Sequence, residues 1–80
     1  MGTKNNHSIR DLGLAAALVS AGHTVVTTEH EPSGRVSFIF TPSDELTEAI
    51  NQYWSNQLTV PARTYSDNIK VLKNMIYERS

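Results

Sequence analysis

The chain has 80 residues, a formal net charge of −1 and no cysteine. Hydrophobic residues make up 39% of it and charged residues 19%, a globular composition that excludes a disordered chain. The length allows one domain, and the lack of cysteine excludes disulfides and thiolate zinc sites. Domains this small often gain stability from a second subunit, so we expect a homo-oligomer, most simply a dimer.

The charge and hydropathy patterns also bear on partners and location. Seven basic residues meet eight acidic ones, so the chain lacks the basic excess of a dedicated nucleic-acid binder. The longest apolar run, Leu12 to Val19, is far shorter than the about 20 residues that span a bilayer. Residues 1–7 are polar and lack the apolar segment of a signal peptide. We therefore expect a cytoplasmic protein without membrane association, with a flexible tail over residues 1–7 and one domain over residues 8–80.

The first predicted element is a helix that begins at Ser8. Ser8 suits the N-cap position, and Asp11 can reach back to its amide as in a capping box. Leucines and alanines continue through Val19 and favour helix. Gly13 lies inside this helix, where it costs up to about 1 kcal/mol against alanine but allows another backbone to approach. Gly22 suits the left-handed residue that follows a helix.

A β-hairpin follows the first helix. His23–Thr28 is rich in threonine and valine, and Val36–Phe40 alternates, so both segments predict strands. The turn between them, Glu31–Arg35, has proline and serine at the centre of a type I turn and glycine at the left-handed position of a G1 bulge.

This turn sets the register of the two strands. Thr28 is expected to pair with Phe38 and Val26 with Phe40, which places Val26 and both phenylalanines on one face. The alternative register would place Glu29 and Glu31 beside Phe38 and Val36, which costs charge burial. We therefore expect the first register.

The other face of the hairpin carries Val25 and Ile39. An open strand edge next to a partly apolar face favours pairing with a second copy. We therefore expect Val25 and Ile39 to contribute to self-association.

Two helices complete the chain. The first has Thr41 as its N-cap with Pro42 at the first helical position, and it ends at Asn56. Pro61 opens the second. Between them Leu58–Val60 is extended and is a candidate for a minimal third strand. Both helices carry an apolar stripe with the spacing of one helical face.

Together these elements predict an α+β fold in the order helix, β-hairpin, helix, helix, that is α-β-β-α-α. A hairpin is marginal alone and needs helices packed on one face, so one core is expected. Its predicted members are Leu14, Leu18, Val26, Phe38, Phe40, Leu46, Ile50, Ile69 and Leu72.

No motif indicates catalysis. No serine stands in a strained nucleophile turn, and glycine-rich phosphate loops are missing. His7, His23 and His30 lack the spacing of metal ligands. We therefore expect no catalytic residue, no metal site and no cofactor, and we interpret the chain as a binding protein and not as an enzyme.

Basic residues concentrate on the last helix, at Arg63, Lys70, Lys73 and, near its end, Arg79. A solvated face with local pairing to Asp67 explains them. The alternative is a surface for an anion, a nucleotide or nucleic acid. A helix-turn-helix reader of DNA is disfavoured, because the apolar stripe of this helix is committed to the core.

Two more residues are candidates for partner or ligand binding. Trp54 points about 100° away from its neighbour Tyr53. It therefore either covers the edge of the core or lies in an interface, where tryptophan is enriched. His23 follows the end of the first helix, where it either complements the helix dipole or contacts a ligand.

Several short motifs form a recognisable series. They are D-L-G-L-A-A-A-L from Asp11 to Leu18, then Gly22-His23, Phe38-x-Phe40, Tyr53-Trp54 and Lys73 near the apolar end of the last helix. From Ser8 to about Tyr77 the chain resembles a family of small proteins of unknown function from phages, prophages and their bacterial hosts. The resemblance brings no catalytic residues and implies a phage-type accessory protein. Small phage proteins of this kind inhibit or sequester host components, including defence proteins and their nucleotide signals.

The expected function is therefore binding. In the first interpretation the homo-oligomer sequesters or inhibits a host factor, either a host protein or a small anionic ligand. In the alternative it is a nucleic-acid-associated accessory protein that uses the basic residues of the last helix. The near-neutral charge favours the first.

Overall fold

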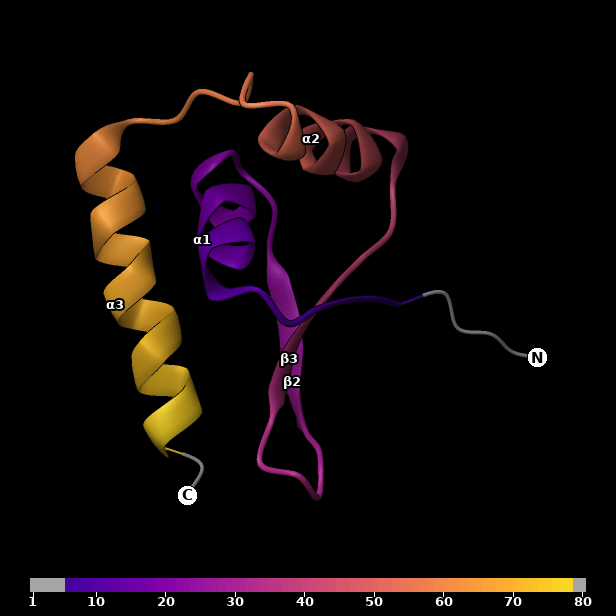
Figure 1. Cartoon of the computed structure of the whole chain (residues 1–80), viewed down its shortest axis with the longest axis vertical. Coiled ribbons are helices and arrows are strands. Elements are labelled where there is room, and N and C mark those ends of the chain that lie inside the picture. Colours follow the sequence, from indigo (N-terminus) through magenta and orange to yellow (C-terminus); the bar gives the residue numbers. More distant parts are fainter. Residues whose placement is uncertain (1–5, 79–80) are drawn as a thin grey trace.

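The computed structural model describes residues 6–78. The fold is α+β, as predicted (Figure 1). This range contains three strands and three helices. In chain order they are β1 (His7–Ile9), α1 (Leu12–Ser20), β2 (Val25–His30), β3 (Val36–Phe40), α2 (Asp44–Trp54) and α3 (Ala62–Glu78). None of these helices is both long and apolar enough to cross a membrane.

The sheet contains a strand that was not expected. Its order is β1-β3-β2 and both pairings are antiparallel, so β3 is the central strand. Ser8 pairs with Ile39 in this sheet, and the prediction that Ser8 caps the first helix is wrong. A strand here occupies the second edge of β3 and buries Ile9, which is 6% exposed. The predicted third strand at Leu58–Val60 is also wrong, because this segment has no strand pairing.

The start of the domain moves accordingly. His7 belongs to β1 and therefore to the sheet, not to a tail. Most of the tail predicted over residues 1–7 lies outside the described residues. Asp11 is the N-cap of α1, and its side chain accepts a hydrogen bond from the Leu14 amide at 3.0 Å. This bond satisfies one of the amides that a helix start leaves without a partner.

The predicted hairpin turn is confirmed. The Gly34 amide donates to the Glu31 carbonyl at 2.9 Å, and the Glu31 amide donates to the Arg35 carbonyl at 2.9 Å. Gly34 has φ of 94°, a conformation that favours glycine because it has no Cβ.

The predicted register holds near the turn and fails at the far end. Thr28 pairs with Phe38 as expected, but Val25 and not Val26 pairs with Phe40. The register shifts between Val25 and Thr27, as in a β-bulge, which inserts one extra residue into a strand. Val26 is consequently 59% exposed, and its predicted place in the core is wrong. Val25 packs against the core instead.

The helix ends follow local capping chemistry. After α1, the amides of Gly22 and His23 donate to the carbonyls of Val19 and Leu18, each at 3.0 Å, which is a Schellman arrangement. Gly22 has φ of 108°, as its predicted role requires.

The second helix begins later than predicted. Ser43 is its N-cap, and the Ser43 hydroxyl accepts from the Leu46 amide at 3.0 Å. Thr41 and Pro42 therefore precede the helix. The cap at Ser43 places Asp44 and Glu45 in the first turn, where their charge complements the helix dipole. The predicted end is confirmed, since α2 stops at Trp54 and Asn56 has φ of 64°.

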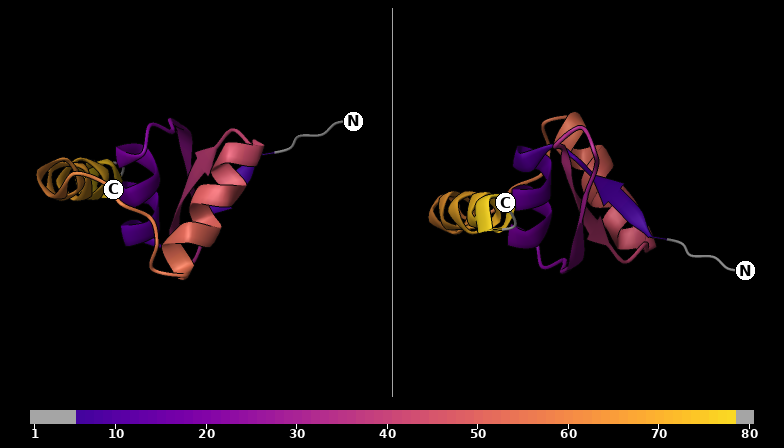
Figure 2. Two further views of the ribbon diagram at one scale, coloured as in Figure 1. Left: turned by 90° about the horizontal axis from the view of Figure 1, so that it is seen from above. Right: turned by 90° about the horizontal axis from the view of Figure 1, so that it is seen from below.

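Helix α1 lies at the centre of the molecule. Helix α3 packs along one side of it and the sheet lies on the other, while α2 covers one end (Figures 1 and 2). Except for Val26, the predicted core residues are buried or pack against the core. The buried cluster is Ile9, Leu14, Ala15, Ala16, Leu18, Phe38, Phe40, Leu46, Ala49 and Leu72.

Candidate functional site

The predicted basic residues lie on the outside of α3. Arg63, Lys70 and Lys73 are exposed, whereas Leu72 on the same helix is 2% exposed and faces α1. Arg63 and Lys70 are two turns apart and follow one line along the helix, because seven residues nearly complete two turns. The expected local pairing with Asp67 is absent, since the ion pair formed among the side chains of residues 6–77 joins Arg10 and Glu31. Arg79 lies outside the described residues.

His23 does not join these residues in any described contact. It is partly buried at the end of α1, where its backbone amide completes the helix-ending turn. Among residues 6–78 no group of three or more histidine and acidic side chains lies close enough to hold a metal ion.

The residues predicted for self-association are not exposed as that prediction required. Ile39 is 2% exposed in the central strand, and Val25 packs against the core because of the bulge. A charged residue at position 39 would therefore disrupt the fold before it tested an interface. The exposed apolar side chain of this hairpin is Val26.

Trp54 is the largest exposed apolar side chain of the described residues. It is 64% exposed, and its ring meets that of Tyr53 edge to face, with centroids 5.0 Å apart and planes at 86°. Beside it lies a hollow of about 450 Å³. We call this the Trp54 hollow; its lining residues are Ala17, Tyr53, Trp54, Asn56, Leu58 and Val60.

The turn after α2 builds this hollow. The Gln57 amide donates to the Gln52 carbonyl at 2.7 Å, and the Leu58 amide donates to the same carbonyl at 3.1 Å. With Asn56 in the left-handed region, the chain reverses and brings Leu58 and Val60 back toward α1. The segment that was a candidate strand therefore forms one wall of this hollow.

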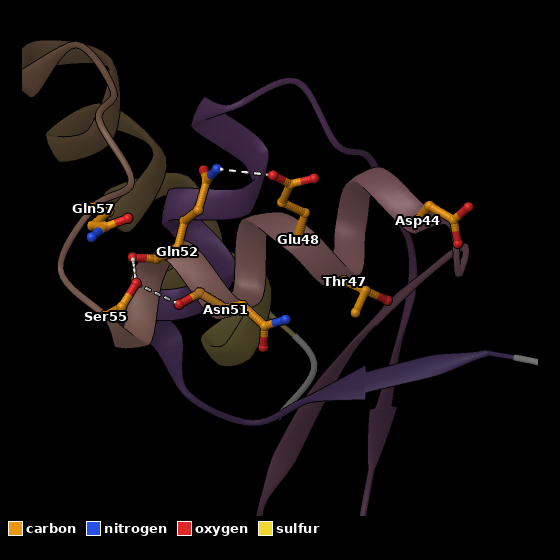
Figure 3. Close-up of a pocket in the computed structure, with 7 residues that line it drawn as sticks. All are labelled: Asp44, Thr47, Glu48, Asn51, Gln52, Ser55 and Gln57. Carbon is orange, nitrogen blue, oxygen red and sulfur yellow. Dashed lines mark hydrogen bonds between the residues drawn. The ribbon is translucent and has the colours of Figure 1, made fainter.

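The outer face of α2 is polar and negatively charged. Asp44, Glu45 and Glu48 are exposed on it, and residues 36–62 contain no lysine, arginine or histidine. Figure 3 shows a second, open hollow along this helix, lined by Asp44, Thr47, Glu48, Asn51, Gln52, Ser55 and Gln57.

The side chains of this polar hollow do not converge. Glu48 and Gln52 point to one side of α2 and are joined by a hydrogen bond of 3.4 Å, whereas Thr47 and Asn51 point to the other side (Figure 3). Ser55 donates to the Asn51 carbonyl of its own helix at 2.9 Å. This geometry contributes charge to the surface but does not arrange an acid and a base around one point.

The surroundings of the Tyr53 hydroxyl raise its pKa above the usual value for tyrosine. Burial raises the pKa of the Tyr53 hydroxyl, and the nearby Asp11 carboxylate and Tyr65 hydroxyl raise it further. Tyr53 therefore stays protonated at neutral pH, and its ring anchors one wall of the Trp54 hollow.

Sequence reasoning missed Arg10 and Arg35. They line a third, smaller hollow together with Gly34, Val36 and Ile76. These five lining residues come from three separate parts of the chain. The arginines are isolated in the sequence, so no cluster of charge marks them. Their proximity follows from the β1 strand and the hairpin turn, and β1 was not predicted.

The fold and these surfaces define a small α+β domain with an exposed tryptophan beside a hollow and an acidic face on α2. Residues 4–78 match the family described as a domain of unknown function, DUF5659, and the chain belongs to this family. This match includes the whole range, Ser8 to about Tyr77, over which the sequence motifs resemble small proteins of unknown function. Comparison with curated proteins and with solved structures gives no match.

Proposed function

We propose that this domain is a non-catalytic binding module whose partner is a protein, and that an apolar side chain of the partner enters the Trp54 hollow. The observation that carries the proposal is a tryptophan that is 64% exposed beside a hollow of about 450 Å³ whose lining includes Ala17, Leu58 and Val60. Exposed tryptophans next to pockets are enriched among the residues that dominate protein–protein affinity. A tryptophan also adds large rigid area with little conformational entropy to lose.

The acidic residues of α2 lie toward its N-terminal end, about 9–15 Å from Trp54 along the helix, and their charge indicates the chemistry of the partner. Helix α2 ends at Trp54 and bears exposed Asp44, Glu45 and Glu48 with no basic residue nearby in the chain. Complementary charge speeds association and excludes partners of like charge. The fitting partner is therefore a protein segment in which basic residues flank an apolar anchor.

The resemblance to phage and prophage proteins supports an origin in a mobile element. In that setting the partner is a host protein in the host cytoplasm, and binding sequesters or inhibits it. Host defence proteins are included in this class. A dimer formed along the free outer edge of β2, where Val26 is exposed, would present the Trp54 hollow twice.

The test is capture of partners from bacterial lysate with tagged protein, with proteins, nucleic acids and nucleotides of the eluate analysed together. Trp54→Ala is the test variant, and Val71→Ala, another exposed apolar residue on a different helix, is the matched control. A protein retained by the wild type and by Val71→Ala but lost with Trp54→Ala supports the proposal. The captured protein should then quench or shift Trp54 fluorescence in a direct titration, since the chain has one tryptophan.

A second candidate function has its own observation. Arg63 and Lys70 lie on one exposed line of α3 and have no ion-pair partner among the side chains of residues 6–77. This arrangement favours contact with a nucleic-acid backbone. Each phosphate contact should then contribute about −0.9 to the log–log slope of affinity against salt. Recovery of DNA or RNA alone, lost with Lys70→Glu and kept with Trp54→Ala, would replace the first proposal by this one.

A further inference from the structure

A hollow of about 270 Å³ lies between the hairpin turn and the C-terminal half of α3. Its lining comes from three separate parts of the chain. Arg10 lies in the link between β1 and α1, Gly34 and Arg35 lie in the turn, and Ile76 lies on α3. This hollow is distinct from the Trp54 hollow, with which it shares no lining residue.

The rim of this hollow is positively charged. Arg10 donates through Nη2 to Glu31 Oε2 at 2.8 Å, and 55% of its side chain is exposed. An arginine has five N–H donors in a planar fork, so Arg10 keeps donors for a ligand while Glu31 holds it in place. Arg35 is exposed and forms no ion pair with a side chain of residues 6–77. Among the side chains of residues 6–77 that line the hollow or pair with its lining, the two arginines and the Glu31 carboxylate leave one positive charge in excess.

The rest of the lining is apolar. Val36 and Ile76 are partly buried, and each presents an aliphatic side chain to the hollow. The volume lies just below the range of about 300–1,000 Å³ that holds drug-sized ligands. The ligand that fits is therefore small, with an anionic group and an apolar group.

We propose that this hollow binds a small organic phosphate monoester, with its phosphate between Arg10 and Arg35 and its apolar part against Val36 and Ile76. A phosphate monoester carries nearly two charges at neutral pH and three acceptor oxygens, which suits two arginine forks. A carboxylate offers one charge and two oxygens, so a single arginine is enough to bind it.

The experiment is calorimetric titration of the full chain with phenyl phosphate, beside phenol, benzoate and inorganic phosphate. Phenyl phosphate is expected to bind about tenfold or more tightly than each of these probes, because it alone satisfies the rim and the apolar lining. Arg10→Gln and Arg35→Gln should each weaken it about tenfold or more. Arg63→Gln is the matched control and should leave binding unchanged, since position 63 is about 20 Å from position 76 along α3.

Three outcomes would overturn the proposal. The first is equal affinity for phenyl phosphate and phenol. The second is the lack of any heat of binding with phenyl phosphate up to millimolar concentration. The third is that Arg63→Gln weakens phenyl phosphate binding as much as Arg35→Gln does. An oligonucleotide without terminal phosphates separates free phosphate esters from nucleic acid as the source of phosphate. Tighter binding of this oligonucleotide than of phenyl phosphate, with loss on Arg35→Gln, would also refute a small-molecule site.

Binding of phenyl phosphate at this hollow does not depend on the proposed protein partner. Trp54→Ala should leave the affinity for phenyl phosphate unchanged, and Arg35→Gln should leave capture of the protein unchanged. Melting temperatures of the variants show whether each is folded, and phenyl phosphate should raise the melting temperature of the wild type but not of Arg35→Gln.

Discussion

The hydroxyl groups of Tyr53 and Tyr65 meet over Gly13. A β carbon on Gly13 would lie 3.0 Å from the Tyr53 hydroxyl oxygen and 3.2 Å from that of Tyr65. Since Tyr53 is on α2 and Tyr65 is on α3, this glycine marks the point where all three helices approach one another. The sequence suggested that Gly13 admits another backbone; the groups it admits are instead two side-chain hydroxyls.

Gly13→Ala tests this arrangement. Alanine inside a helix should stabilise by up to about 1 kcal/mol relative to glycine, but here its methyl group would displace both hydroxyls. We compare the change that Gly13→Ala makes to the free energy of unfolding in two backgrounds. We expect this change to be at least about 0.5 kcal/mol less favourable in the wild type than in a Tyr53→Phe/Tyr65→Phe background. Urea unfolding of the four proteins in this cycle measures the difference. If the effects simply add, the tyrosines do not restrict position 13.

The raised pKa of Tyr53 predicts a loss of stability at alkaline pH. The folded state holds the Tyr53 proton more tightly than the unfolded chain, in which tyrosine has a pKa of about 10. The resulting stability is complete below about pH 10 and is lost as pH rises through the folded pKa. Thermal unfolding between neutral and strongly alkaline pH should show a steeper decline for the wild type than for Tyr53→Phe.

Asp11→Asn separates the causes of this shift. Asparagine keeps the N-cap function of Asp11 but removes the charge that disfavours the Tyr53 phenolate. The tyrosinate absorbance should then appear at lower pH than in the wild type, while burial keeps the pKa of Tyr53 raised. An unchanged titration would mean that burial alone sets it.

Much of the fold was predictable because its signals are local. The hairpin turn at Glu31–Arg35, the glycine after α1 and the start of α3 each depend on the conformational limits of a few neighbouring residues. The strand β1 was missed because three residues carry little pattern and gain their structure from pairing with β3. Ser8 has the right chemistry for a cap, but the chain places it in the sheet.

The candidate sites were less predictable than the fold. Exposure of Trp54 depends on where the chain turns after α2, and the sequence left its role open between core edge and interface. Arg10 and Arg35 are 25 positions apart, and only the pairing of the strands brings them to one hollow. Residues that gather through tertiary structure leave no mark in a single sequence.

The bulge in β2 predicts opposite sensitivities for two adjacent valines. Val25→Ala removes two methyl groups that pack against the core and should cost about 1–1.5 kcal/mol. Val26→Ala changes a side chain that is 59% exposed and should stay within about 0.5 kcal/mol of the wild type. The midpoints of urea unfolding compare the two variants directly. The regular register would give the reverse order.

Phe38 and Trp54 offer the widest contrast in the molecule. Phe38 is fully buried in the central strand, and Phe38→Ala should cost about 3–5 kcal/mol. That is much of the about 5–15 kcal/mol that stabilises a typical domain, so the variant should be largely unfolded at 37 °C. Trp54→Ala removes a larger ring that is 64% exposed and should cost no more than about 1.5 kcal/mol, the upper range of its edge-to-face contact with Tyr53. Circular dichroism melts of both variants test this. An unfolded Trp54→Ala protein would show that the ring supports the fold. That result would contradict the proposal that the Trp54 hollow is a docking surface.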